Sequence, residues 1–325
     1  MSTQLDLGRA VPFRTARDPV SQPVLRRWCD ALGVENPLYN LPDVAARTRF
    51  GRVVAPLAML DVWTKPGLAY IRNPADPLGS AFEMLDGEGF TSAVAVSSAL
   101  VQSRPVSLDE TLTSSIMLES VTSEKVTALG QSRFVTTKEE FFVDGTAVGS
   151  SRFTVMKFRP SGERRASGSG ASGVPRRRRH AGDVRRDQTG TVVAGALSSG
   201  SALPVVEIPV SATLIVGGAL ATSDYFDAHH DRDAAMRRGS RDIFMNIHTT
   251  LGLLQRCVGD WLGPDILWRS MSVRLGVPSY PGDSLTVIAD VSSCDHATGA
   301  TSIDVLAHNS LGHHAEGRID VVLPV

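Results

Sequence analysis

The sequence predicts an α+β fold made of two similar units, each a long helix wrapped by an antiparallel sheet, an arrangement known as a double hot dog. Three observations predict it. The second half has one long apolar helical stripe, followed by four stretches in which apolar and polar residues alternate, as in strands with one buried face. The first half has four comparable alternating stretches. The segment 30–60 also aligns without a gap on the segment 220–250, at a constant offset of 190 in residue number, which favours duplication of one unit and pairing of the two sheets.

The long helix of the second half is predicted over residues 243–261. Apolar side chains recur along one face of this segment, for example at Ile247 and Leu254, with the spacing of a helix that packs on a core. Asp242 is a suitable N-cap before it, and the Gly-Pro pair at 263–264 is a suitable end. The alternating stretches that follow, such as DSLTVIADVSS, predict the strands that wrap it.

Turn signals show that the first half is longer than the second. Asp144-Gly145 is typical of a tight hairpin. The segment from Asn309 to Gly312 holds the same place in the second half, at an offset of 165 rather than 190. The first half therefore has about 25 extra residues, which we place at residues 65–90. We expect this insertion to replace or shorten the first long helix and to leave room for a bulky group.

Residues 161–190 differ in kind from their surroundings. They contain eight basic and three acidic side chains, many Gly and Ser, and hardly any apolar residue, so they cannot bury enough surface to fold. We predict a flexible basic linker there, between domains at residues 1–160 and 191–325. The four arginines at 176–179 could indicate nucleic-acid binding. However, the segment has no aromatic side chain to stack on bases and neither domain is basic, so no nucleic-acid partner is expected.

The cysteines and the apolar runs indicate in which cellular compartment the protein is expected. Cys29, Cys257 and Cys294 are odd in number and far apart, so a reducing compartment is expected. No apolar run approaches the roughly 18–20 residues that cross a membrane, and the first residues do not resemble a signal peptide. We therefore expect a cytoplasmic protein without a membrane partner.

Histidine placement locates the chemistry in the second half. All eight histidines lie at or beyond position 180, so the first half cannot supply a histidine acid or base. The second half contains Asp224 and His229 in SDYFDAHHDRDAA, whereas the aligned positions of the first half hold Val34 and Tyr39. An Asp–His pair can exchange protons near neutral pH. The comparison predicts one working site and one lapsed site.

The segments HHDRDAA, GSRDIFMNI, DWLGP and RLGVPSYPGD resemble the MaoC-like hydratases, in particular the actinobacterial steroid side-chain enoyl-CoA hydratase subunits. LGVENPLYNLPDVAARTRFGRVVAP resembles the N-terminal dehydratase-like domain of such proteins. The resemblance spans most of the chain except the linker. It implies addition of water to a 2-enoyl thioester, or its removal from a 3-hydroxyacyl thioester, by Asp224 and His229, with the backbone N–H of Asn246 holding the thioester oxygen. It implies an acyl-CoA or acyl-carrier thioester as substrate, no metal or other cofactor, and allows a homodimer of double hot dogs.

This sequence departs from the common pattern of the family at two pairs of positions. The family has Asn-Pro between the Asp and the His, and His-Gly at the helix start, whereas this chain has Phe226-Asp227 and Met245-Asn246. The steroid-type members carry a similar variation, so we interpret it as specialisation for a bulky substrate such as a steroid side chain.

Two other functions remain to be weighed against the hydratase. Thioesterases with this fold place an acidic residue in the long helix, and residues 243–259 contain none. A non-catalytic acyl-binding role suits the first half better than the second. The sequence leaves open whether coenzyme A or a carrier protein bears the acyl group, as in polyketide or fatty-acid dehydratases, and which direction is physiological. His248 is expected to pack in the helix, and His313 and His314 to be exposed.

Overall fold

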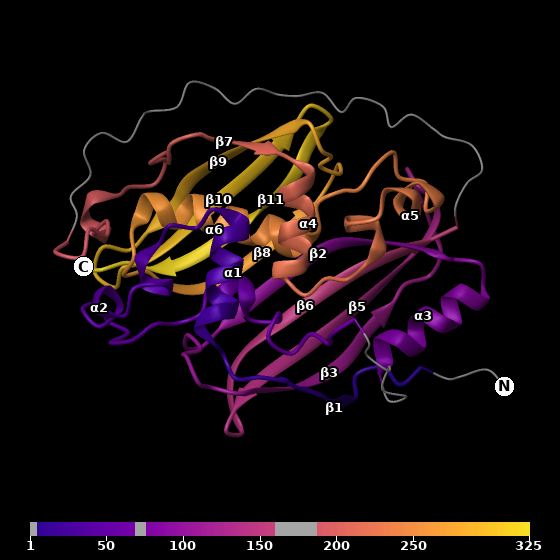
Figure 1. Ribbon diagram of the computed structural model, residues 1–325, viewed down its shortest axis with the longest axis horizontal. Helices are drawn as coiled ribbons and strands as arrows, with labels where there is room; N and C mark the ends of the chain where they lie inside the picture. Colours follow the sequence, from indigo (N-terminus) through magenta and orange to yellow (C-terminus); the bar gives the residue numbers. More distant parts are fainter. Residues whose placement is uncertain (1–4, 69–75, 160–186) are drawn as a thin grey trace.

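The computed structural model describes residues 5–68, 76–159 and 187–325, and its strands join into one continuous antiparallel sheet (Figure 1). The sheet runs in the order β1-β3-β5-β6-β2-β8-β11-β10-β9-β7, with the short β4 paired to β5. The strands of the first half are β1 (Ala10–Thr15), β2 (Ser92–Gln102), β3 (Leu112–Val121), β4 (Lys125–Thr127), β5 (Gly130–Val143) and β6 (Thr146–Phe158). Those of the second half are β7 (Val206–Val210), β8 (Leu267–Leu275), β9 (Asp283–Cys294), β10 (Ala300–Asn309) and β11 (Gly312–Val322).

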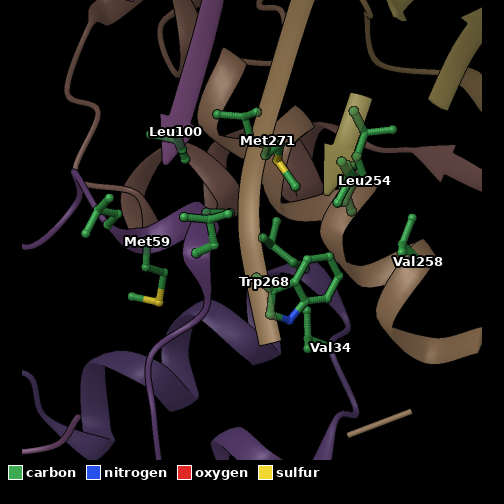
Figure 2. Close-up of a cluster of buried hydrophobic side chains, with 14 of the residues drawn as sticks. Val34, Met59, Leu100, Leu254, Val258, Trp268 and Met271 are labelled. Carbon is green, nitrogen blue, oxygen red and sulfur yellow. The ribbon is translucent and has the colours of Figure 1, made fainter. Parts of the chain in front are cut away.

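The two halves of the sheet meet at β2 and β8, which pair antiparallel with Leu100 opposite Met271. Outward from this junction the two halves have equivalent strand orders, β2-β6-β5-β3-β1 in the first half and β8-β11-β10-β9-β7 in the second. Leu100 and Met271 belong to a hydrophobic core that also contains Met59, Leu254 and Trp268 (Figure 2). The predicted α+β double hot dog, with its two sheets paired edge to edge, is confirmed.

Four helical elements recur in the two halves. In the first half they are α1 (Gln22–Leu32), η1 (Pro37–Tyr39), α2 (Pro42–Ala45) and η2 (Leu57–Met59). In the second half they are α4 (Ala212–Ala221), η4 (Asp227–His229), α5 (Arg232–Arg237) and α6 (Ile247–Leu262). Each element of the second half begins at the same offset of 190 from its counterpart, as the alignment of the halves predicts. The other helical elements are α3 (Pro77–Gly87) and η3 (Ala194–Ala196).

The central helix α6 begins four residues later than predicted. Its N-cap is Asn246, whose side-chain oxygen accepts the backbone N–H three residues on at 2.8 Å. The expected cap, Asp242, instead accepts the N–H of Ile243 at 2.8 Å. The backbone between these positions is held extended, because the N–H of Met245 donates to the carbonyl of Ser279 at 3.0 Å. The helix ends at Gly263, as predicted.

The first half has no counterpart to the length of α6 among its described residues. The helix that begins at the equivalent position, η2, spans only three residues. Instead α3 packs at the far end of β3 and β5, where Leu85 and Phe90 join a second, smaller apolar cluster with Leu118 and Val135 (Figure 1). The expectation that the first long helix is shortened is confirmed.

The extra residues of the first half are less concentrated than predicted. From the start of η2 to the start of β2 the chain takes 35 residues, against 20 from the start of α6 to the start of β8. The predicted insertion at residues 65–90 therefore holds about 15 of the extra residues. The others are spread over the later strands and their connections: from the start of β2 to the start of β6 the chain takes 54 residues, against 45 from the start of β8 to the start of β11.

Most of the predicted linker at residues 161–190, with its four arginines, lies outside the described residues. Its last four residues form a turn in which the Asp187 carboxylate accepts the backbone N–H of Thr191 at 2.9 Å. The domain division at 1–160 and 191–325 stays a prediction. Across the described ranges, no helix combines the length and apolar character needed to cross a membrane.

Candidate active site

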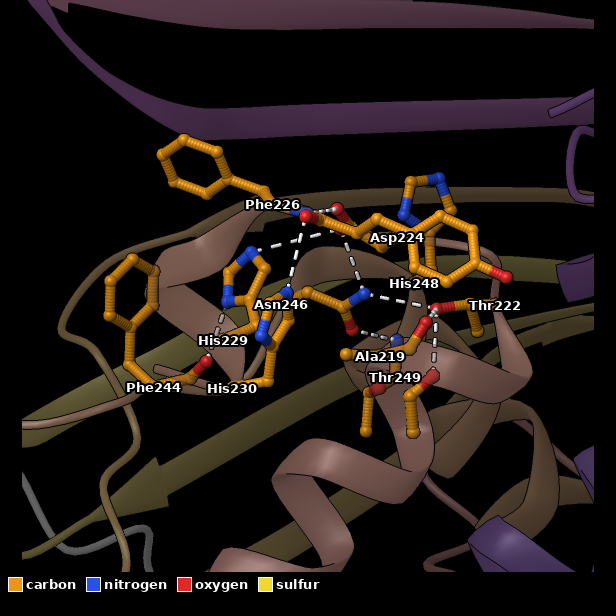
Figure 3. A network of polar contacts seen from close by, with 12 residues as sticks. Ala219, Thr222, Asp224, Phe226, His229, His230, Phe244, Asn246, His248 and Thr249 are labelled. Atoms are coloured by element: carbon orange, nitrogen blue, oxygen red, sulfur yellow. Dashed lines mark hydrogen bonds and ion pairs between the residues drawn. The ribbon is translucent and has the colours of Figure 1, made fainter. Parts of the chain in front are cut away.

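The structure brings Asp224 and His229 together. Asp224 follows α4, and His229 ends η4, the 3-10 turn that begins three residues later. The two side chains face each other (Figure 3), with 3.7 Å between Asp224 Oδ2 and His229 Nε2. This distance is too long for a direct hydrogen bond, and it leaves room for both atoms to accept from one shared donor. The Asp224 side chain is 22% exposed and that of His229 8% exposed, so the pair is enclosed but still reachable.

One hydrogen bond orients the His229 ring. Its Nδ1 lies 2.7 Å from the carbonyl oxygen of Phe244, and a carbonyl can only accept, so Nδ1 carries the hydrogen. Nε2 is then the lone-pair nitrogen when the ring is neutral, and it points toward Asp224. Burial lowers the pKa of His229, against the opposing effects of the Asp224 charge and the Phe244 carbonyl, which favours the neutral ring. The Phe226 and Phe244 rings pack edge-on against it.

Asn246 holds the Asp224 carboxylate in place. Its Nδ2 donates to Asp224 Oδ2 at 2.9 Å and to Thr222 Oγ1 at 3.0 Å (Figure 3). The backbone N–H of Phe226 donates to Asp224 Oδ1 at 3.3 Å. From the sequence, a role was expected only for the backbone of Asn246. In the structure its side chain has two roles, because it caps α6 and also donates a hydrogen bond to Asp224. The sequence signal that could have identified this cap is an Asn at the start of a helix, preceded by an apolar run.

A second polar cluster next to Asp224 was missed in the sequence. Lys65 of the first half lies with Nζ 2.9 Å from Nε2 and 3.0 Å from Nδ1 of His248, and 3.3 Å from the carbonyl oxygen of Thr222. Asp61 Oδ2 is 2.9 Å from His248 Nε2. His248, which the sequence assigned to packing, therefore also makes polar contacts with Lys65 and Asp61 across the two halves.

These charges decide the protonation state of the carboxylates. Burial alone would raise the pKa of Asp224, but Lys65, His229 and His248, in that order, lower it to below the ordinary value. For Asp61 burial is again opposed, by His248 and Lys65, which bring the pKa to about 2. Asp224 is therefore a carboxylate at neutral pH, because a cation from the other half of the chain lies near it.

The start of α6 supplies backbone donors beside this pair. Asn246 is 2% exposed, and its backbone N–H has no acceptor within the described part of the chain. Such N–H groups lie at the positive end of the helix dipole. They can stabilise negative charge that develops on an oxygen placed there.

In the first half, the groups at the positions equivalent to this site form hydrogen bonds with another side chain of the protein, Gln255. Tyr39 accepts a hydrogen bond from the side-chain amide of Gln255 on α6 at 3.1 Å. The carbonyl of that amide accepts the backbone N–H of Ala58 at 2.7 Å, at the start of η2, and Pro56 has no N–H. Val34 is buried in the core. That the first half is a lapsed site stays a prediction.

The expectation that His314 is exposed was wrong. It is 1% exposed, and it contacts the Thr250 hydroxyl at 3.0 Å and the Val277 carbonyl at 2.8 Å through its two ring nitrogens. The pairing of β10 with β11 shifts register between Ala307 and His308. This bulge breaks the in–out alternation, so His314 and the next residue are both buried. His313 is exposed, as predicted.

Comparison with known proteins agrees with the fold. The family described as the FAS1-like dehydratase domain region matches residues 9–150. The beta subunit of 3-oxo-4,17-pregnadiene-20-carboxyl-CoA hydratase from Mycobacterium tuberculosis is 43% identical over 122 residues, which are 38% of this chain and 93% of that subunit. The alpha subunit is 36% identical over 150 residues, 46% of this chain. The chain spans about half, 48%, of that alpha subunit.

Solved structures share the architecture over nearly the whole chain. A MaoC-like dehydratase has a TM-score of 0.72 at 20% identity and covers 98% of both chains. A Mycobacterium tuberculosis protein described as a double hotdog fold has a TM-score of 0.64 at 12% identity, covering 98% of this chain and 96% of its own. The continuous sheet with its duplicated order of strands and helical elements thus defines a double hot-dog protein. The chain belongs to the MaoC-like enoyl-CoA hydratase/dehydratase family, together with the steroid side-chain hydratase subunits.

Proposed function

We propose that this chain is a hydro-lyase that adds water to a 2-enoyl-CoA thioester, or removes it in the reverse direction, with Asp224 and His229 as its catalytic pair. The observation that carries the proposal is the geometry of the pair. A carboxylate oxygen and an imidazole lone pair lie 3.7 Å apart, beside the start of α6. The family relationship and the hydratase names of the relatives support the same reaction class.

The proposed reaction uses one water held between the two side chains. One member of the pair accepts a proton from this water as its oxygen bonds to C3 of the enoyl group. The negative charge that develops on the thioester oxygen is stabilised by the backbone N–H of Asn246. The same proton then passes from the pair to C2, so water is added across the double bond and the pair returns to its starting state. Dehydration follows the same steps in reverse.

We propose a bulky, steroid-like acyl group as the substrate tail. Two features support this. Among the described residues, the helix that begins at the place equivalent to α6 is only the three-residue η2, so no helix of the length of α6 covers the inner face of the first-half sheet there. The relatives are named for a pregnadiene-carboxyl-CoA substrate. Because those relatives are named as subunits, we further propose that this chain acts in an oligomer. The simplest form is a homodimer, which light scattering on the purified chain would test.

The proposal is tested with Asp224→Asn and His229→Ala, assayed by the loss of enoyl absorbance on hydration of a bulky 2-enoyl-CoA. Each variant should lower turnover at least about a hundredfold, because general acid–base groups contribute that much or more. Matched controls are Asp227→Asn and His230→Ala, which change a neighbouring residue of the same type.

The controls should keep turnover close to wild type. Asp227 binds Arg238 on the surface, and His230 is exposed. In the double variant Asp224→Asn with His229→Ala, calorimetry should still detect binding of the thioester. Turnover near wild type in both single variants, with folding verified by circular dichroism, would refute the assignment.

A further inference from the structure

The two halves end the helix that precedes the candidate catalytic pair in the same way. Gly33 comes after α1 with a φ of 64°, and Ser223 comes after α4 at the equivalent position with a φ of 52°. In each half the backbone N–H of the next residue, Val34 or Asp224, donates to a carbonyl of the helix at 2.9 Å. This is the left-handed helix ending in which glycine is the usual residue. The first half has that glycine, whereas the second half has a serine.

The serine is unfavourable in this conformation, because its Cβ lies close to a backbone carbonyl oxygen when φ is positive. Two other described residues with a Cβ have a positive φ, and both are aspartates, Asp109 and Asp144. Aspartate tolerates the conformation because its short side chain can hydrogen-bond locally. The Ser223 hydroxyl makes no hydrogen bond within the described part of the chain. Gly33 shows that the turn needs no hydroxyl, so the ending of α4 does not explain the serine.

The turn around Ser223 is held on two sides by its neighbours. Thr222 is buried, and its hydroxyl donates to the carbonyl of Gly218 at 2.8 Å and accepts from Asn246 Nδ2 at 3.0 Å. Its carbonyl oxygen lies 3.3 Å from Nζ of Lys65, which comes from the first half. Bonds from α6 and from the first half therefore maintain a backbone conformation that a serine disfavours. Strained residues that are held in this way are typical of functional sites.

The duplication predicts where the Ser223 side chain points. In the first half, Nη1 of Arg256 on α6 donates to the carbonyl of Leu32 at 2.8 Å, just as Lys65 binds the equivalent carbonyl of the second half. A Cβ on Gly33 would lie 3.2 Å from this Arg256 nitrogen. We therefore expect the side chain of Ser223, on the equivalent Cβ, to point toward the end of Lys65.

The same comparison indicates that this side chain borders the candidate active site. Arg256 lines a small pocket together with Val34 and Tyr39, the two residues at the positions equivalent to the candidate catalytic pair. The equivalent surroundings of Ser223 in the second half are those of the pair itself. Ser223 is partly exposed, and the Asp224 side chain next to it is 22% exposed, so a bound molecule can contact both.

We propose that Ser223 is a further catalytic residue, whose hydroxyl donates a hydrogen bond to the thioester oxygen of the substrate. The inference rests on the proposed function, in which negative charge develops on this oxygen beside the backbone N–H of Asn246. The turn that carries Ser223 contacts the same residue, through the bond between Thr222 and the Asn246 side chain. The hydroxyl keeps its proton and adds a second donor to that N–H, and donors aimed at developing charge stabilise the transition state. This role accounts for a serine where the first half has glycine.

The test is Ser223→Gly, which gives the second half the residue of the first. Loss of one donor to the thioester oxygen should lower kcat at least about thirtyfold in the hydration of a bulky 2-enoyl-CoA. KM should change less than about threefold, because the bond strengthens in the transition state. The same substitution relieves the left-handed strain, so in urea unfolding the ratio of folded to unfolded chain should rise about threefold. A serine with a purely structural role would not give a variant that is more stable and less active.

Two further variants at position 223 separate the hydroxyl from the backbone. Ser223→Ala keeps the strain and loses the hydroxyl, so kcat should fall as in Ser223→Gly without the gain in stability. Ser223→Asn tolerates the left-handed conformation and keeps a donor, so kcat should recover to within about fivefold of wild type. The matched control is Gly33→Ser, the reverse exchange in the first half. It should lower the ratio of folded to unfolded chain about threefold and keep kcat within about twofold of wild type.

The outcomes separate this inference from the proposed function. Wild-type kcat in both Ser223→Gly and Ser223→Ala, when the wild-type chain is active, would overturn the inference and leave the proposed function intact. An equal loss of kcat in Gly33→Ser would also overturn it, because both turns would then act only through the fold. Absence of hydration by the wild-type chain would instead reject the proposed function, and the inference with it.

Discussion

Asn246 gives the sharpest single test of how the site is built, because one side chain does two things. Its oxygen caps α6 through the N–H of Thr249, and its nitrogen donates to the Asp224 carboxylate at 2.9 Å. Asn246→Ala removes both interactions. Asn246→Ser keeps a good cap but loses the bond to Asp224, so the pair of variants separates the two contributions to the free energy of unfolding.

The magnitudes follow from the environment. Loss of a helix cap costs about 1 kcal/mol. Loss of a hydrogen bond to a largely buried carboxylate costs about 2 kcal/mol more, because Asp224 then keeps its charge with one donor fewer. Asn246→Ala should therefore lower the free energy of unfolding by about 3 kcal/mol, and Asn246→Ser by about 2 kcal/mol. Ser211→Ala is the reference, because Ser211 caps α4 through the N–H of Leu214 on the exposed surface and should cost only about 1 kcal/mol.

Urea unfolding followed by circular dichroism measures all three variants. The decisive quantity is the difference between Asn246→Ala and Ser211→Ala. If both lower the free energy of unfolding equally, the bond between Asn246 and Asp224 contributes nothing, and the description of Asn246 as the support of the Asp224 carboxylate is wrong. A further check is Asn246→Ala in an Asp224→Asn background, where its cost should shrink toward that of a cap alone.

Three further predictions concern the charges and the duplication. Lys65→Met removes a cation that lowers the pKa of Asp224, so the acid limb of the pH profile of kcat/KM should move to higher pH; an unmoved limb would exclude this role. The pKa of Asp61 is about 2 in the folded chain against an ordinary 3.8. Its stabilising effect is therefore present above about pH 4 and is lost as the pH falls toward 2, and Asp61→Asn should flatten the acid unfolding curve in that window. Val34→Asp with Tyr39→His should not restore turnover to the Asp224→Asn variant, because the N–H at the start of η2 is already bonded; measurable rescue would show that the first site can still work.

Much of this protein follows from local patterns. The alternation of the strands, the hairpin at Asp144-Gly145 and the end of the long helix at Gly263 depend on neighbouring residues, and the structure has all three. The duplication is also a linear property of the sequence, and each helical element recurs at the predicted offset. Asp224 and His229 could be placed together because only a short turn separates them.

Other features depended on segments that are distant in the sequence. The start of α6 moved because a carbonyl beyond β8 binds Met245, and His314 turned inward because of a bulge opposite β10. Neither effect has a signal in the residues around it.

The fold class, the duplication and the pairing of Asp224 with His229 could all be inferred from the order of the residues, because periodicity and short spacing act between neighbours along the chain. The surroundings of that pair could not. Lys65 and Asp61 come from the other half of the chain, far from His248 in sequence, and meet it where the two halves pack together. Charge and burial depend on which segments lie next to each other in space, so the electrostatics of the site are set only when the two sheets have joined at β2 and β8.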